Sequence, residues 1–267
     1  MRFVAIEETA IHTAWRPAAE GAPTLVFANS LGTDLRIWDE VVAALPAALG
    51  ILRYDKRGHG LSQPGEETDR LARHVADLAG LIAEAGIGQH VVVGLSVGGV
   101  IAAAYGAARP AGLAGLVLSN TAARVGSAAV WDERIAAVRA HGLAGIAGAV
   151  MERWFSPAFR RDETVALAGL STMLTRQDAE GYIAICRMLR EADLRESVGT
   201  IEVPTLCIAG TADLSTPPAV VEDTAGRISG AAFASIEGVG HIPCVEVPAD
   251  YAARLLTFLQ ANALLPR

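Results

Sequence analysis

Cysteine is scarce in this sequence, and the three residues present, Cys186, Cys207 and Cys244, are widely spaced in apolar surroundings. An odd number at such spacing provides neither a disulfide framework nor a metal site, so we expect reduced, buried thiols in a cytoplasmic protein. Basic residues are also in deficit, because the net charge is −7. This acidic balance gives no support to nucleic acid or an anionic membrane as a partner.

The sequence also shows no pattern of an export signal or a membrane span. Acidic residues follow the start of the chain where the apolar region of a signal peptide would run. The longest apolar stretch, which begins at His90, contains glycines and a serine and changes its period at its centre. This change favours a buried strand followed by a buried helix. With 52% apolar residues, the 267-residue chain can form one large α/β domain or a core with an inserted subdomain.

That stretch carries the strongest chemical pattern in the chain. A run of β-branched residues stops at Gly94, an alanine-rich helical pattern begins after Gly98, and Ser96 lies between them in a Gly-x-Ser-x-Gly motif. A tight strand-to-helix turn would expose the serine hydroxyl, and glycine on either side avoids a collision. The motif therefore predicts a nucleophilic serine, with a glycine-rich turn around an idle serine as the alternative.

Strand and helix patterns alternate over most of the chain. Residues 1–20 alternate apolar and polar side chains in part, as an antiparallel edge hairpin would. Short apolar strand patterns lie at residues 23–28, 51–55, 90–94, 115–119, 203–209 and 232–236, and helical patterns at 38–45, 68–85, 217–227 and 248–261. This order predicts an α/β fold with a mostly parallel, doubly wound sheet that helices cover on both faces.

The rhythm changes after Asn120. Residues 122–194 contain no convincing buried strand, and their helical patterns lie at 128–141, 143–154, 162–174 and 178–191. We interpret this segment as an inserted helical cap. Residues 1–121 and 195–267 then form the core.

A serine nucleophile needs a base within hydrogen-bond reach, and the base needs an acid that orients it. In an open parallel sheet, ligand sites lie at the carboxyl ends of the strands. Asp213 and His241 each follow a predicted strand directly and come after Ser96 in the sequence. We therefore expect Ser96, Asp213 and His241 to form a catalytic triad.

The other histidines fit structural positions better. His12 is expected on a surface strand, His74 within a helix, His90 at a strand start and His141 in the cap. His59 lies at a strand end, but in a glycine-rich turn. Asp55 is the competing acid, and we expect it to pair with Arg57 and lock that turn.

Two backbone N–H groups must stabilise the oxyanion. One is expected from Val97, directly after the nucleophile, and one from the loop that follows an earlier strand. The loop Asn29-Ser30-Leu31-Gly32 is in that position, with Leu31 as the expected donor. A plain strand-to-helix turn is the alternative for this loop.

The whole chain resembles the α/β-hydrolase fold family through Gly94-Leu95-Ser96-Val97-Gly98-Gly99, Asp213 and Gly240-His241. The segment Tyr54-Asp55-Lys56-Arg57-Gly58-His59-Gly60-Leu61-Ser62 is similar to a structural turn of that family. An aspartate at position 96 would be typical of haloalkane dehalogenases and epoxide hydrolases, so the serine disfavours both.

A narrower resemblance, to the 3-oxoadipate enol-lactonases of aromatic-acid catabolism, covers both core and cap. It rests on Phe27-Ala28-Asn29-Ser30-Leu31-Gly32-Thr33-Asp34, Ile37-Trp38-Asp39, Arg153-Trp154-Phe155-Ser156-Pro157, Gly181-Tyr182 and Ala192-Asp193-Leu194. The resemblance implies hydrolysis of a lactone ring to 3-oxoadipate in the β-ketoadipate pathway, with no metal and no organic cofactor. Most relatives of this fold have His-Gly where this chain has Asn29-Ser30.

The implied partner is a small lactone that carries a carboxylate, so a cationic or hydrogen-bonding group of the cap should face it. The candidates are Trp131, Trp154, Arg134 and Arg124. A carboxylesterase or a carbon–carbon bond hydrolase with the same triad is the first alternative, and a non-catalytic small-ligand binding protein is the second. The sequence leaves the oligomeric state open, a homo-oligomer included.

Overall fold

The computed structural model describes residues 2–265, which fold around one eight-stranded sheet of order β1-β2-β4-β3-β5-β6-β7-β8. The strands are β1 (Arg2–Ile6), β2 (Thr9–Arg16), β3 (Thr24–Ala28), β4 (Gly50–Tyr54), β5 (His90–Leu95), β6 (Leu113–Ser119), β7 (Thr205–Gly210) and β8 (Ala232–Ile236). Strand β2 pairs antiparallel with β1 and β4, and every other pair in the sheet is parallel. The predicted α/β class, the edge hairpin and the mostly parallel sheet are confirmed.

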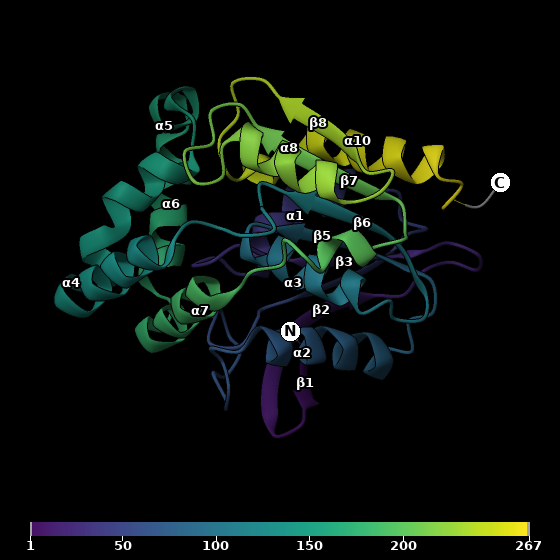
Figure 1. The fold of residues 1–267 in the computed structure, drawn as a ribbon, viewed down its shortest axis with the longest axis horizontal. Helices are drawn as coiled ribbons and strands as arrows, with labels where there is room; N and C mark the ends of the chain where they lie inside the picture. The colour runs from purple at the N-terminus through teal and green to yellow at the C-terminus, as the bar shows by residue number, and fades with distance from the viewer. Residues whose placement is uncertain (1, 266–267) are drawn as a thin grey trace.

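Helices cover both faces of the sheet (Figure 1). On one face α2 (Leu71–Glu84) contacts α3 (Val97–Ala107), and the short helix η2 (Val198–Thr200) connects α3 with α8 (Pro218–Arg227). On the other face α1 (Asp39–Ala44) contacts α9 (Pro243–Glu246) and α10 (Pro248–Ala261). The helix expected over 38–45 is a 3₁₀ turn, η1 (Leu35–Trp38), followed by α1. Asp34 caps this turn because its carboxylate accepts from the Arg36 N–H.

Four α-helices, which precede η2 in the segment between β6 and β7, gather at one end of the sheet in Figure 1. They are α4 (Ala128–Trp154), α5 (Pro157–Asp162), α6 (Thr164–Thr175) and α7 (Ala179–Glu191). Helix α4 is kinked at Gly142, where φ is 65°, so its two halves correspond to the two helical patterns expected there. The short α5, which has Pro157 in its first turn, was not predicted. The division into core and cap stays a prediction.

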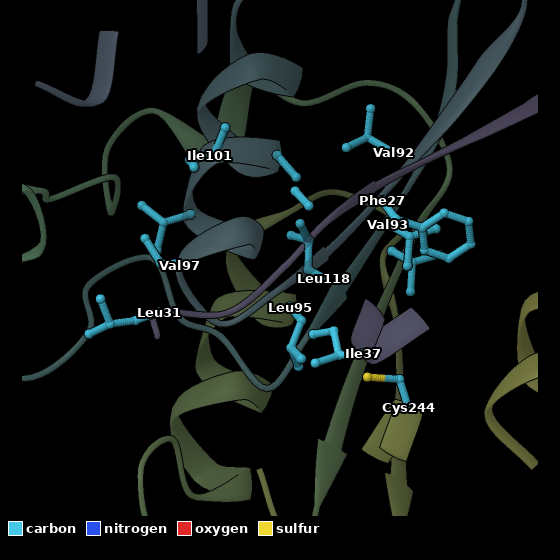
Figure 2. Packing of buried hydrophobic residues seen from close by; sticks show 14 of the residues in the cluster. Phe27, Leu31, Ile37, Val92, Val93, Leu95, Val97, Ile101, Leu118 and Cys244 are labelled. Atoms are coloured by element: carbon cyan, nitrogen blue, oxygen red, sulfur yellow. The ribbon is translucent and has the colours of Figure 1, made fainter. Parts of the chain in front are cut away.

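The apolar runs of the parallel strands form the core. Phe27, Val92, Val93 and Leu118 are buried beneath the helices, and Figure 2 shows Val97 and Ile101 of α3 among the neighbouring side chains. All three cysteines are buried and free, as expected. Within residues 2–265 no helix has the length and apolar character to cross a membrane.

Candidate active site

Ser96 occupies a strained turn between the end of β5 and the start of α3. Its φ of 56° and ψ of −120° lie in a region that residues with side chains rarely adopt. A Cβ atom at Gly94 would collide with the Gly98 carbonyl oxygen, and one at Gly98 with that of Ala28. The Thr121 hydroxyl donates to the Ser96 carbonyl at 2.7 Å and holds the turn from the end of β6. The packing therefore requires both glycines of the motif.

His241 and Asp213 meet at the carboxyl ends of β8 and β7. Nδ1 of His241 lies 2.8 Å from Oδ2 of Asp213, and both side chains are buried. Helix α4 contributes to this arrangement, because the His241 N–H donates to the Trp154 carbonyl at 2.7 Å. With Nδ1 facing the carboxylate, Nε2 is the nitrogen left to exchange a proton with a nucleophile.

Asp213 is surrounded by donors. Oδ2 accepts from Asn120 Nδ2 at 2.9 Å and from the Thr216 hydroxyl at 2.7 Å, and Oδ1 accepts from the backbone N–H groups of Ser215 and Thr216. Burial acts to raise the pKa of Asp213, but the neighbouring His241 and these hydrogen bonds outweigh it and hold the pKa below its ordinary value. The carboxylate is therefore ionised and able to orient the imidazole.

The N–H groups of Leu31 and Val97 lie in the two loops where an oxyanion site was expected. Within residues 2–265 neither N–H donates to another protein group. Leu31 follows β3 and Val97 begins α3, and Figure 2 labels both side chains at the margin of the core packing. Two free donors beside a serine are what a tetrahedral intermediate needs.

One cavity brings the expected residues together. Ser96 and His241 line it from the ends of β5 and β8, and Trp131, Arg134 and Trp154 line it from α4. Further lining residues are Ser30, Leu31, Val125, Gly126, Val130, Val150, Arg153, Tyr182 and Ser215. Arg134 donates to the Tyr182 hydroxyl at 3.3 Å, and both residues line the cavity that contains Ser96.

Of the four expected contacts, only Arg124 lies outside the cavity. Trp131 lines it, and its indole N–H donates to the Val125 carbonyl at 2.7 Å. Arg124 does not line the cavity and instead pairs with Asp193 at 3.1 Å. We therefore leave Arg124 out of the proposed substrate contacts.

Comparisons with known proteins agree with this geometry. The sequence pattern of the family described as serine aminopeptidase S33 matches residues 17–247. The chain is 34% identical over 226 residues to 3-oxoadipate enol-lactonase 2 of Acinetobacter baylyi, covering 85% of this chain and 84% of that relative. It is 37% identical over 197 residues to 3-oxoadipate enol-lactonase 1 of the same organism, covering 73% of each. The chain belongs to the α/β-hydrolase family.

A solved structure extends the likeness of this α/β-hydrolase over nearly its full length. The enol-lactonase from Burkholderia xenovorans superposes with a TM-score of 0.92 and is 35% identical. The superposition covers 97% of this chain and 100% of that structure. The sheet, its covering helices and α4–α7 therefore share their arrangement with an enol-lactonase.

The turn after β4 of the α/β-hydrolase differs from expectation. Asp55 does not pair with Arg57, because its carboxylate contacts His12 Nδ1 at 2.8 Å and accepts from the N–H groups of Leu35 and Leu61. Arg57 instead makes a two-pronged ion pair with Asp77 of α2. The expectation of a locking Asp55–Arg57 pair was wrong, and so was that of a surface His12, whose side chain is 13% exposed. The pairing of β2 with β4 and the packing of α2 beside the turn determine the partners of Asp55 and Arg57.

His59 is structural, as expected. Its Nε2 accepts from the Gly32 N–H at 2.9 Å and so fixes the loop that carries Leu31. Burial drives the pKa of His59 well below its ordinary value, so the ring is neutral and can accept this bond.

Sequence reasoning missed Asn120, Thr216 and Glu246. Glu246 accepts from Ser156 and from the Gly240 N–H at 3.0 Å, and thus connects the His241 loop to the segment between α4 and α5. Asn120 directly follows strand β6, so the rule of strand carboxyl ends could have identified it.

Proposed function

We propose that this α/β-hydrolase opens the lactone ring of 3-oxoadipate enol-lactone by nucleophilic catalysis at Ser96. The observation that carries the proposal is the shared cavity, which Ser96, His241 and Arg134 of α4 all line. A nucleophile and a cation in one cavity suit an acyl substrate that bears a carboxylate. The similarity to three enol-lactonases supports the same substrate.

In the first step, His241 Nε2 takes the proton of the Ser96 hydroxyl as its oxygen attacks the lactone carbonyl. The N–H groups of Leu31 and Val97 donate to the oxyanion that forms. Asp213 stabilises the imidazolium through the 2.8 Å contact with Nδ1.

Collapse of the intermediate breaks the bond between the carbonyl carbon and the ring oxygen. The ring oxygen takes the proton that His241 removed from Ser96 and leaves as an enol, which is a better leaving group than an alkoxide. The enol then tautomerises to the ketone. Water, deprotonated by His241, attacks the acyl group on Ser96 and releases the second carboxylate of 3-oxoadipate.

The carboxylate of the substrate binds at the cap end of the cavity. Arg134 is held there by the Tyr182 hydroxyl, which is itself buried. The Ser30 hydroxyl lines the same cavity and has no protein partner among the described residues, so it is free to donate to a polar group of the substrate. Trp131 and Trp154 provide apolar walls.

The test measures the loss of ultraviolet absorbance of freshly generated 3-oxoadipate enol-lactone with wild type and with Ser96→Ala. A simple aryl ester is assayed as the second substrate with both proteins. We expect fast lactone loss that disappears in Ser96→Ala, with slow ester cleavage. Ester cleavage without lactone turnover would refute the lactonase assignment and retain a serine esterase. No turnover of either substrate would favour a binding protein.

A further inference from the structure

Lys56 is the only lysine in the 267-residue sequence, and the structure buries it to 2% exposure beside the candidate oxyanion site. Its Nζ donates to the carbonyl oxygen of Ser30 at 2.6 Å. Within residues 2–265 this is the one hydrogen bond that Nζ makes. A buried amine aimed at a backbone carbonyl is costly, because burial disfavours the charged form. Nothing in the triad uses it.

The Ser30 carbonyl belongs to the same peptide unit as the Leu31 N–H. In a planar trans peptide the C=O and N–H bonds point in opposite directions. Lys56 therefore lies behind the Ser30–Leu31 peptide, and the oxyanion would lie in front of it. A cation on the carbonyl side draws electron density toward the oxygen and makes the N–H a stronger donor, as hydrogen bonds in a chain polarise one another.

The rest of the loop is fixed independently of Lys56. The Thr33 hydroxyl also donates to the Ser30 carbonyl, at 2.9 Å, and the Gly32 N–H donates to His59. Removing the amine should therefore leave the peptide in place while withdrawing the charge behind it. The charge and the position of the donor can thus be separated by experiment.

The surroundings of Lys56 leave its amine partly protonated near neutral pH. Burial lowers the pKa of Lys56 to about 7, against the attraction of Asp55 and Asp34. Both carboxylates are engaged elsewhere, Asp55 with His12 and Asp34 with Arg36. The remaining titratable groups near it are His59, His74 and the Arg57–Asp77 pair.

We propose that Lys56 is a positioning residue that strengthens the Leu31 N–H as an oxyanion donor through the Ser30–Leu31 peptide. The proposal rests on the proposed function, since it assumes that an oxyanion forms at Leu31. The effect is switched by protonation: the ammonium strengthens the donor and the neutral amine does not. Catalysis therefore weakens as Lys56 loses its proton.

The coupling between the Lys56 charge and the oxyanion can be measured without kinetics, because thermodynamic linkage acts equally in both directions. If the Lys56 charge stabilises an oxyanion, an oxyanion must stabilise the Lys56 charge by the same free energy. A phosphonate on Ser96 supplies such an oxyanion: the serine oxygen bonds to phosphorus, p-nitrophenolate leaves, and the serine proton passes to solvent through His241. We expect the pKa of Lys56 to rise by about one unit in this adduct, which corresponds to about tenfold in rate.

The single lysine makes the experiment direct. Protein labelled with ¹³C and ¹⁵N in lysine gives one side-chain signal, which is titrated by NMR in free wild type and in the adduct of Ser96 with a p-nitrophenyl alkylphosphonate. Ser96→Ala, which cannot form the adduct, is treated identically as the control. An adduct with an unchanged Lys56 pKa would overturn the proposal alone. Failure of Ser96 to react at all would refute the proposed function, and this proposal with it.

A kinetic arm separates charge from structure. For Lys56→Met we expect kcat on the enol-lactone to be about tenfold below wild type at pH 6, with KM unchanged, and the two rates to converge above pH 8. Lys56→Arg, which cannot lose its charge, should keep its advantage over Lys56→Met at pH 8. A ratio of wild type to Lys56→Met that does not vary with pH would mean a merely structural role and contradict the proposal.

Discussion

Asn120 Nδ2 donates to Asp213 Oδ2 across 2.9 Å and joins the end of β6 to the end of β7. The same amide group donates to the Gly240 carbonyl at 3.2 Å, directly before His241 in the chain. One buried side chain thus contacts the acid of the triad and the loop that carries its base. The backbone of Asn120 has a φ of 46°, which asparagine tolerates better than most residues. Its position is therefore set by both conformation and chemistry.

Asn120→Asp should lower kcat/KM on the enol-lactone by tenfold or more. The change removes the donor and places a second carboxylate beside Asp213, so the pKa of the pair rises and the imidazolium loses stabilisation. The activity loss should be largest at low pH, which a kcat/KM profile between pH 5 and pH 9 would measure.

Asn262→Asp is the matched control, because it makes the same chemical change in the C-terminal region, where Asn262 donates to the Phe258 carbonyl. It should retain wild-type activity. Equal activity of Asn120→Asp and wild type at every pH would show that the 2.9 Å contact does not support the triad.

Arg134→Gln should raise KM for the enol-lactone by roughly 10- to 100-fold with little change in kcat, since a charged hydrogen bond is worth about 1.5–3 kcal/mol. Arg124→Gln removes an arginine that pairs with Asp193 outside the cavity and should leave KM unchanged. An aryl ester without a carboxylate should be cleaved equally by both variants. A rise in KM for Arg124→Gln alone would reverse our assignment of the carboxylate site.

The sequence predicted those parts of the site that depend on local geometry. Gly94 and Gly98 stand where any Cβ would collide with backbone, and the strand-end rule selected Asp213 and His241 without knowledge of the contacts. The continuous apolar runs of the parallel strands, which alternate with helical patterns along the chain, likewise predicted the fold.

Contacts set by tertiary register could not be predicted in this way. Asp55 meets His12, which is 43 residues away on β2, because that strand runs beside β4 in the sheet. No sequence spacing distinguishes this partner from Arg57, two residues on. The same holds for Arg124, since the position of Asp193 depends on how the chain returns from α7 to the core.

The free energy of unfolding of Ser96→Gly should exceed that of Ser96→Ala by about 1–2 kcal/mol, although we expect neither variant to be active. At a φ of 56° glycine adopts the turn without steric cost, whereas alanine keeps the strain of the serine. Urea unfolding of both variants gives the difference.

The control for this comparison is Ser197, which has an ordinary φ of −84°. There Ser197→Gly should be less stable than Ser197→Ala, because glycine loses more backbone entropy. If the alanine variant were more stable than the glycine variant at both positions, the turn at Ser96 would store no strain.

His74 should make the protein less stable in acid. Burial lowers the pKa of His74 to about 4, while Nε2 contacts the Thr68 carbonyl at 2.8 Å. In the unfolded chain an ordinary histidine has a pKa of about 6.5. Between these pKa values the unfolded state binds a proton that the folded state does not. The contribution of neutral His74 to the free energy of unfolding is therefore fully present above pH 6.5 and is lost as the pH drops toward 4. His74→Gln retains a donor but cannot titrate. The free energy of unfolding of wild type should therefore fall by up to about 3 kcal/mol relative to His74→Gln between pH 7 and pH 4.

The control is His141→Gln, at an exposed position of α4, which should follow wild type over the whole pH range. If wild type and His74→Gln gave parallel profiles in urea titrations, the buried imidazole would contribute nothing to acid unfolding.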